Sequence, residues 1–184
     1  MLPVIETDRL ILREVEKKDA KQIFACFQDE NVTRYYGLEP FDSMEQAEKM
    51  IGWFKDQYHD NHDKKGMRWG IERKDAKGII GTIGFNSWVP KHKRAEVGYE
   101  IHPNYWRNGY AFEALENVLS FGFEKLGLNR IGAVVFIENA ASHQLLIKAG
   151  FQSEGILRGY MYQNGLPHDT RVYSILNEDV DETL

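Results

Sequence analysis

The chain has 184 residues, 42% of them hydrophobic, and this length and composition suit one domain over residues 1–184 that buries its own core. The formal net charge is −5, and the lysine and arginine residues are spread along the chain. A nucleic-acid partner is therefore not expected, because proteins that follow a phosphate backbone need a concentrated basic face.

The N-terminal stretch MLPVIETDRLILRE has no basic region, no long apolar run and no cleavage site of a secretory signal. No later apolar run has the length of a bilayer span, so no membrane partner is expected. The single cysteine, Cys26, lies among apolar residues and cannot form an internal disulfide, as is typical of a reducing compartment. We expect a cytoplasmic protein in which Cys26 is a small buried core residue.

The first third of the chain is expected to form one strand and two helices. Residues 9–14 alternate like a strand, and Asp19 precedes apolar residues at helical spacing. Ser43 and Gln46 form a capping box before a second helical pattern that reaches Tyr58.

Histidines and aspartates follow this second helix in the stretch YHDNHDKK. His59, Asp60, His62 and Asp63 raise the question of a metal site, but no further cluster of ligands completes a coordination shell. We therefore expect a polar, exposed helix end and no bound metal.

Three strands are expected to follow as an antiparallel meander. Residues 67–73 and 79–88 flank the turn-forming stretch KDAKG, and residues 95–101 alternate strictly. In the third strand, Glu96 and Glu100 lie on one face.

A helix from about Ala111 and a buried strand over 130–137 come next. This strand–helix–strand unit requires a parallel pair with a right-handed crossover.

The last part of the chain is expected to hold a short helix and a closing hairpin. Asn139 stands at the start of the helix, and Gly150 is positioned to end it. Asn164 and Gly165 are turn residues between two strand-like runs, and Pro167 belongs beside this turn or on a sheet edge. The whole pattern predicts an α+β (mixed α/β) fold, in which a twisted mixed sheet of about seven strands carries helices on both faces.

The stretch HPNYWRNGYAFEALENVL begins the long helix without a capping side chain. Gly109 leaves the backbone N–H groups of the first turn open, and the small Ala111 leaves that turn uncluttered. Together with the helix dipole, such N–H groups bind an anion such as a pyrophosphate, although an isolated glycine is also compatible with a plain turn. A nucleotide P-loop and a dinucleotide fold are not supported, since neither GxxxxGKS/T nor an early GxGxxG is present.

Four separated motifs, which occur along the chain in the order that the family shows, resemble the GNAT superfamily of acetyl-CoA-dependent N-acetyltransferases. The stretches EVGYEIHPNYWRNGYAFEAL and NAASHQLLIKAGF are similar to its two cofactor motifs. The start ETDRLILREVEKKDA and the end NGLPHDTRVYSIL resemble the branch that contains the RimJ and RimL ribosomal-protein α-amino acetyltransferases and the spermidine acetyltransferases. The resemblance covers roughly residues 5 to 176 and implies a GNAT-type fold with acetyl-CoA as cosubstrate.

The resemblance also implies a set of cofactor-binding residues. In the pyrophosphate motif of the family, Gly109 and Ala111 match, and Trp106 stands where the RimJ/RimL-like branch carries an aromatic residue. The pantetheine arm would lie where the two parallel strands splay apart. Asn139 is the expected side-chain contact to that arm, although a plain helix cap is compatible with the same position. The implied set is Ile101, His102, Arg107, Asn108, Gly109, Tyr110, Ala111 and Asn139.

Glu96 is the first candidate for the base that takes a proton from the amine. It lies on the strand before the pyrophosphate loop, about where many family members carry a base. Glu100, His102 and a water molecule remain alternatives for the base. Glu96, Glu100 and His102 are each also compatible with a solvated strand position or a local ion pair.

Ser142 is the candidate acid that protonates the leaving thiolate. The spermidine branch places a tyrosine seven residues after the motif asparagine, but this chain has Leu146 there. The RimL-like pattern uses a serine three residues after the asparagine, which Ser142 matches, although a serine at a helix start is also compatible with a cap. The glutamate that the RimL-like pattern carries beyond the Gly-Phe pair is Met161 here, so the base arrangement of that branch is not reproduced.

The sequence therefore predicts an N-acetyltransferase that moves an acetyl group from acetyl-CoA to a primary amine, a protein N-terminal α-amino group first of all. A small-amine acetyltransferase acting on a polyamine or an amino-bearing toxin remains an alternative, as does a non-catalytic CoA-binding module. A homodimer is expected from the resemblance and from the edge that a closing hairpin offers. The aromatic candidates for the acceptor pocket, most of which are expected in the core, are Tyr35, Tyr36, Trp69, Trp88 and Tyr160.

Overall fold

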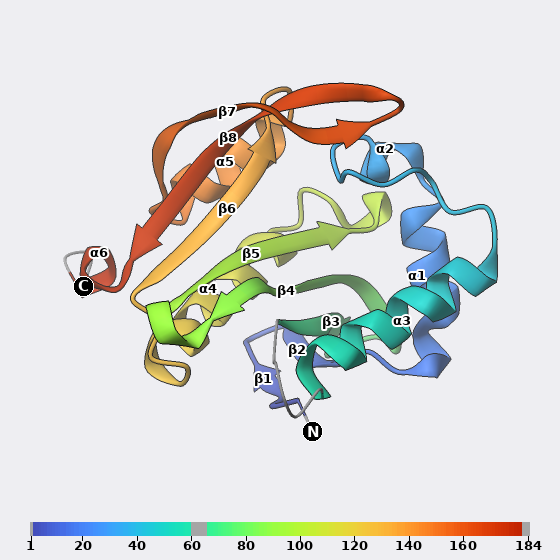
Figure 1. Cartoon of the computed structure of the whole chain (residues 1–184). Helices are drawn as coiled ribbons and strands as arrows, with labels where there is room; N and C mark the ends of the chain where they lie inside the picture. The colour runs from blue at the N-terminus through green and yellow to red at the C-terminus, as the bar shows by residue number, and fades with distance from the viewer. Residues whose placement is uncertain (1, 60–65, 182–184) are drawn as a thin grey trace.

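A mixed sheet of eight strands runs through the computed structural model, which describes residues 2–59 and 66–181 (Figure 1). Its strand order is β1-β2-β3-β4-β5-β6-β8-β7. The expected mixed sheet is confirmed, and it exceeds seven strands because the short β1 pairs antiparallel with β2, with Ile5 opposite Leu12. The strands are β1 (Ile5–Glu6), β2 (Leu10–Glu14), β3 (Met67–Arg73), β4 (Ile79–Val89), β5 (Arg94–Ile101), β6 (Arg130–Phe136), β7 (Gln152–Gln163) and β8 (Leu166–Leu176).

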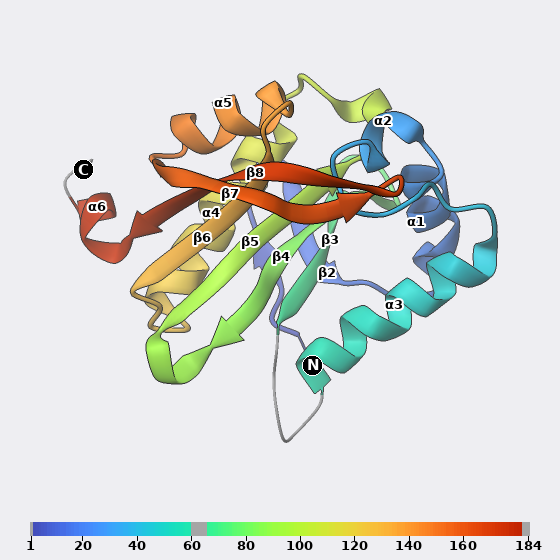
Figure 2. The same ribbon diagram turned by 45° about the horizontal axis from the view of Figure 1, so that its top comes forward.

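Helices cover both faces of the sheet, as the sequence predicts (Figure 2). On one face α1 and α3 pack over β4 and β3, and on the other α4 packs against β2, β4 and β5. α5 joins the α4 side through the buried Leu146. The helices and helical turns are η1 (Lys17–Asp19), α1 (Ala20–Phe27), α2 (Glu30–Thr33), α3 (Met44–His59), η2 (Pro90–His92), η3 (Pro103–Tyr105), α4 (Tyr110–Glu124), α5 (Ala140–Lys148) and α6 (Asn177–Asp181).

Two apolar clusters fill the space between the sheet and its helices. The larger cluster lies under α4 and includes Trp69 and Leu115, both fully buried. The smaller cluster lies under α1 and α3 and includes Phe27 and Cys26. Burial raises the pKa of the Cys26 thiol, so this residue stays protonated and apolar in character. The prediction of a buried core cysteine is confirmed.

Cap residues lie where the sequence places them. The side chain of Gln46 accepts a hydrogen bond from the Ser43 N–H at 3.2 Å, which forms one half of the expected capping box before α3. Gly150 follows α5 with φ of 90°, a left-handed conformation that ends a helix at low cost. The short α2 was not expected from the sequence. It starts because the Asp29 side chain accepts from the Asn31 N–H at 2.8 Å.

The closing hairpin is also confirmed. Asn164 and Gly165 have φ values of 53° and 72°, as a tight two-residue turn between β7 and β8 requires. Pro167 lies beside this turn, opposite Tyr162. β7 is the edge strand of the sheet, and β8 separates it from β6.

The stretch YHDNHDKK starts in the last turn of α3, and Asp60, His62 and Asp63 lie outside the described residues. Over residues 2–59 and 66–181, no three potential ligand side chains are grouped so that they could hold a metal ion. In the same ranges, no helix combines the length and apolar character that a membrane crossing demands.

Candidate active site

β5 and β6 are parallel neighbours that pair briefly and then separate. The pairing joins Arg94–Glu96 of β5 to Arg130–Gly132 of β6. Beyond these residues β5 stays paired with β4, and β6 stays paired with β8. The separation leaves part of both strands unpaired with each other in the middle of the sheet, which is the splay that the family resemblance implies.

The loop before α4 presents backbone N–H groups instead of a capping side chain. Gly109 is the N-cap residue with φ of 79°, and no side chain caps this helix. The first helical hydrogen bond runs from the Glu113 N–H to the Gly109 carbonyl at 3.1 Å. Within the described residues, the N–H groups of Gly109, Tyr110 and Ala111 have no hydrogen-bond partner. Such donors at the positive end of a helix dipole suit an anionic ligand.

A cavity of about 670 Å³ lies against this loop, between β5, α2, α4 and α5, and we name it the loop cavity. Of the predicted cofactor-binding residues, the structure brings six together in its lining: Ile101, Arg107, Gly109, Tyr110, Ala111 and Asn139. The other two lie beside it. His102 accepts the Asn104 N–H at 3.3 Å and so caps η3, and the Asn108 side chain donates to the Trp106 carbonyl at 2.9 Å.

Cations line the loop cavity. They are Arg34, Arg107 and Lys148, and the ammonium of Lys148 lies 3.9 Å from the centre of the Phe112 ring. Trp106, the aromatic residue at the start of the glycine motif, donates its indole N–H to the carbonyl of Ile101 at 2.5 Å. This contact fixes the loop to the end of β5.

A second cavity, of about 760 Å³, opens between the splayed strands, α3 and the β7–β8 hairpin, and we name it the sheet cavity. Its walls are mainly apolar and aromatic. Among the described residues that line it, Glu96 carries the single carboxylate, while Lys49 and Arg68 are basic. Lys49 pairs with Glu45 on the exposed side of α3. The main apolar and aromatic lining residues are Tyr35, Tyr36, Leu38, Phe41, Met50, Trp53, Val97, Val135, Phe136, Leu146, Tyr160 and Met161.

The aromatic candidates from the sequence separate into two groups. Tyr35, Tyr36 and Tyr160 line the sheet cavity. Trp69 belongs to the core, where its indole N–H donates to the Pro3 carbonyl at 2.7 Å. Trp88 lines a separate cavity near the end of α4.

The two cavities meet at a small set of shared lining residues. The Tyr99 hydroxyl lies 2.7 Å from the Ser142 hydroxyl, and the Asn139 side chain accepts the Ser142 N–H at 3.2 Å. Asn139 is thus a helix cap as well as a lining residue. Burial raises the pKa of Tyr99 to about 12, although the hydrogen bond with Ser142 acts in the opposite direction. The shared residues are Tyr35, Tyr36, Tyr99, Asn139 and Ser142.

Glu100 lies in a buried ion pair rather than at a solvated strand position. Its carboxylate contacts the Arg68 guanidinium and accepts hydrogen bonds from Thr82 and from Tyr36, the last at 3.0 Å. Burial raises the pKa of Glu100, while Arg68 and the two hydroxyl groups oppose the shift. With these donors already on its oxygens, Glu100 is poorly placed to take a proton from a substrate.

Sequence reasoning missed Tyr99 and Arg68 as site residues. The signal for Arg68 was a cation inside the otherwise buried strand MRWGI, since a buried cation needs a partner. Tyr99 gave no such signal, because a tyrosine in a strand next to a helix is common in an ordinary core.

Comparison with known proteins shows which family has this site. The model of the acetyltransferase (GNAT) domain matches residues 9–152. The uncharacterised N-acetyltransferase YoaA of Bacillus subtilis (strain 168) is 60% identical over 176 residues, which are 96% of this chain and 98% of that protein.

Two solved structures from Vibrio cholerae are similar over nearly their whole length. A provisionally assigned ribosomal-protein-serine acetyltransferase superposes with a TM-score of 0.82 at 26% identity, covering 96% of this chain and 99% of its own. A spermidine N-acetyltransferase in complex with CoA and spermine superposes with a TM-score of 0.80 at 26% identity, covering 94% and 98%.

Proposed function

Because this chain belongs to the acetyltransferase (GNAT) family, we propose that it transfers the acetyl group of acetyl-CoA to the α-amino group at a peptide or protein N-terminus. N-acetyltransferase activity and acetyl-CoA as cosubstrate follow from the family. The observation that carries the proposal is that two unlike cavities meet at Tyr99 and Ser142.

The residues of the loop cavity suit acetyl-CoA. The free N–H groups of Gly109, Tyr110 and Ala111 offer donors to the pyrophosphate, and the nearby cations favour a polyanion. The pantetheine arm would run along the end of β5, from Ile101 to Tyr99 and past Asn139, with its thioester end toward Ser142 at the junction of the two cavities.

The chemistry then needs two proton transfers. The amine nitrogen attacks the thioester carbonyl, and Glu96 accepts the proton of the amine, directly or through water. The C–S bond breaks, and the Ser142 hydroxyl gives its proton to the departing sulfur. Ser142 regains a proton from solvent, to which Glu96 releases the proton that it took from the amine. Tyr99 holds the Ser142 hydroxyl in place. Glu96 lines only the sheet cavity, whereas Ser142 lines both cavities. This arrangement supports a base on the acceptor side and an acid at the junction.

The charge of the sheet cavity favours a peptide amine over a polyamine. A polyamine carries several positive charges at neutral pH and needs several carboxylates to replace its lost hydration. Of the described lining residues, Glu96 alone could supply one, and the two basic residues, Lys49 and Arg68, are already paired with Glu45 and Glu100. A peptide N-terminus brings one amine, and apolar walls suit a large first side chain.

We propose to place the chain in the RimJ/RimL-like branch of the family. In the sheet cavity it departs from the residue pattern of the spermidine acetyltransferases and from that of the RimL-like enzymes. Leu146 stands where the spermidine branch has a tyrosine, and Met161 stands where the RimL-like pattern has a glutamate. Both substitutions replace a polar group by an apolar one, so we propose an acceptor with a more apolar first residue than serine.

A homodimer remains part of the proposal. The β7–β8 hairpin leaves large apolar side chains exposed at the edge of the sheet, and such a surface is often covered by a second copy. Light scattering that shows a monomer at working concentration would rule this out. The exposed residues are Ile156, Leu157, Tyr160, Tyr162 and Leu166.

Thiol release from acetyl-CoA tests the proposed function. The acceptors are a peptide that begins with leucine, the same peptide with a blocked N-terminus and an internal lysine, and spermidine. We expect kcat/KM for the free peptide to exceed that for spermidine by at least about tenfold, a difference of about 1.4 kcal/mol, with the acetyl group on the α-amine by mass spectrometry. A preference for spermidine would overturn the proposed acceptor. CoA binding without turnover of any acceptor would indicate the non-catalytic module.

A further inference from the structure

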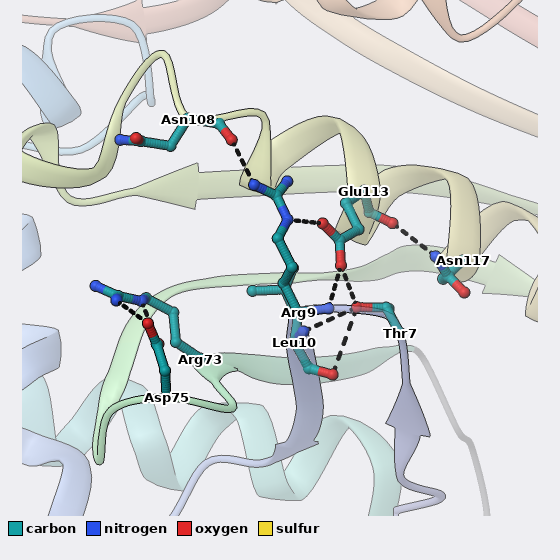
Figure 3. Close-up of polar contacts among 8 residues, drawn as sticks. All are labelled: Thr7, Arg9, Leu10, Arg73, Asp75, Asn108, Glu113 and Asn117. Carbon is teal, nitrogen blue, oxygen red and sulfur yellow. Dashed lines mark hydrogen bonds and ion pairs between the residues drawn. The ribbon is translucent and has the colours of Figure 1, made fainter.

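Arg9 lies immediately before β2 and reaches the loop before α4, although about a hundred residues separate the two in sequence. Figure 3 shows its guanidinium between Asn108 and Glu113. Nη1 donates to the Asn108 carbonyl at 3.0 Å, and Nε donates to the Glu113 carboxylate at 2.6 Å. The same guanidinium lies 4.7 Å from the centre of the Tyr110 ring. Arg9 therefore contacts the loop, the first turn of α4 and an aromatic ring that lines the loop cavity.

The hydrogen bond to Asn108 determines which way one peptide unit points. In a planar trans peptide the C=O and the following N–H point in opposite directions. The described residues contain no cis peptide bond, so a carbonyl of Asn108 turned toward Arg9 turns the Gly109 N–H away from Arg9. Gly109 lines the loop cavity and its N–H has no partner among the described residues.

This orientation needs an external constraint. Gly109 adopts φ of 79°, and a glycine populates positive and negative φ about equally well. No side chain caps α4, so the helix itself does not fix the Asn108–Gly109 peptide. Arg9 supplies the constraint from outside the loop.

The position of Arg9 is itself well determined. The Glu113 carboxylate accepts the Arg9 backbone N–H at 2.8 Å and the Thr7 hydroxyl as well as the Arg9 side chain. Burial alone would raise the pKa of Glu113, but these hydrogen bonds outweigh it and keep the pKa below its usual range. Glu113 therefore stays ionised at neutral pH and balances the charge of Arg9, so Arg9 acts mainly through the backbone of the loop.

We propose that Arg9 is a positioning residue, which holds the Asn108–Gly109 peptide so that the Gly109 N–H faces the phosphate groups of acetyl-CoA. The inference rests on the cofactor site of the proposed function but does not depend on the acceptor.

The test compares Arg9→Ala and Arg9→Lys with a matched control, Arg73→Ala. Arg73 lies in the same cluster, 5.8 Å from the Tyr110 ring, but it pairs with Asp75 and makes no hydrogen bond to the loop (Figure 3). By calorimetry, Arg9→Ala should raise the Kd for CoA about tenfold, as expected for the loss of one hydrogen bond to a charged group. Arg9→Lys should recover part of this affinity, and Arg73→Ala should bind CoA like the wild type.

A donor without phosphate groups separates positioning from general damage to the fold. With S-acetylpantetheine, Arg9→Ala should match the wild-type rate, because the Gly109 N–H then has no phosphate to bind. An unchanged Kd for CoA in Arg9→Ala would overturn the inference. An equal loss of rate with acetyl-CoA and S-acetylpantetheine would overturn it too, since that pattern indicates a purely structural role. A wild type that binds CoA but acetylates nothing would refute the proposed function and leave the Kd comparison valid.

Discussion

The loop cavity and the sheet cavity meet at shared residues but are built in different ways. The loop cavity takes its donors from consecutive backbone over residues 107–111 and adds scattered cations. The sheet cavity is assembled mainly from side chains that come from α3, α5, β5, β6, β7 and residues 35–41. A backbone site persists through most substitutions, whereas a side-chain site changes with each one. Cosubstrate binding is therefore expected to be robust in this fold, and acceptor choice is expected to vary.

The strongest test of the loop cavity is Gly109→Trp. A tryptophan cannot easily adopt φ of 79°, and its Cβ would lie 3.4 Å from the Arg9 guanidinium, so the substitution should distort the loop that offers its N–H groups to the phosphates. At a hundred times its Kd, acetyl-CoA should stabilise the wild type by about 2.7 kcal/mol and raise its Tm by about 5–10 °C. The variant should show no such rise. Circular dichroism checks that it is folded, and a preserved rise in a folded variant would place the cosubstrate elsewhere.

Glu96→Gln probes the sheet cavity without touching the loop. If Glu96 is the base, kcat/KM should fall by about 100-fold near neutral pH while the Kd for acetyl-CoA stays unchanged. Free α-amino groups have pKa values of about 8, so many acceptor molecules are already neutral at pH 9 and the deficit should shrink there. A variant that stays within about threefold of wild type from pH 6 to 10 would exclude Glu96 as the base.

Ser142 and Tyr99 test the junction of the two cavities. Ser142→Ala should lower kcat about tenfold, most on the alkaline side, because the thiolate then lacks its proton donor.

Tyr99→Phe should lower kcat by about two- to fivefold, the effect of one positioning hydrogen bond. The pKa of Tyr99 is raised to about 12, so its hydroxyl stays neutral up to pH 10 in the folded protein. The raised pKa of Tyr99 stabilises the folded protein fully at any pH below the pKa of tyrosine in the unfolded chain. This stabilisation is lost only as the pH rises toward 12. A pH profile below 10 that changes shape in Tyr99→Phe would contradict this assignment.

The smallest expected effect comes from adding a charge to the rim of the sheet cavity. Leu38 lines this cavity and is 37% exposed, so Leu38→Glu should be tolerated. A second carboxylate should raise kcat/KM for spermidine about fivefold relative to the leucine peptide, since a partly exposed charge pair is worth about 1 kcal/mol. Leu38→Gln is the uncharged control. Equal behaviour of the two variants would show that charge does not set acceptor choice.

The same contrast explains what the sequence could and could not predict. Strands, helices and the Asn164-Gly165 turn follow local patterns, and the glycine loop is a contiguous motif. Most of the fold and most of the lining of the loop cavity could therefore be predicted from the sequence. The contact of Arg9 with Asn108 and the hydrogen bond between Tyr99 and Ser142 join distant segments. No periodicity reports such contacts, because they arise only when the strands and helices pack.

The central claim is that acetyl-CoA occupies the loop cavity and the acceptor amine enters through the sheet cavity. A crystal structure with CoA and a leucine-initiated peptide tests this most directly. The predicted result has pyrophosphate oxygens within hydrogen-bond distance of the Gly109 and Ala111 N–H groups, the sulfur beside Ser142 and the peptide amine on the side of Glu96. Phosphate groups in the sheet cavity, or a sulfur far from Ser142, would contradict it.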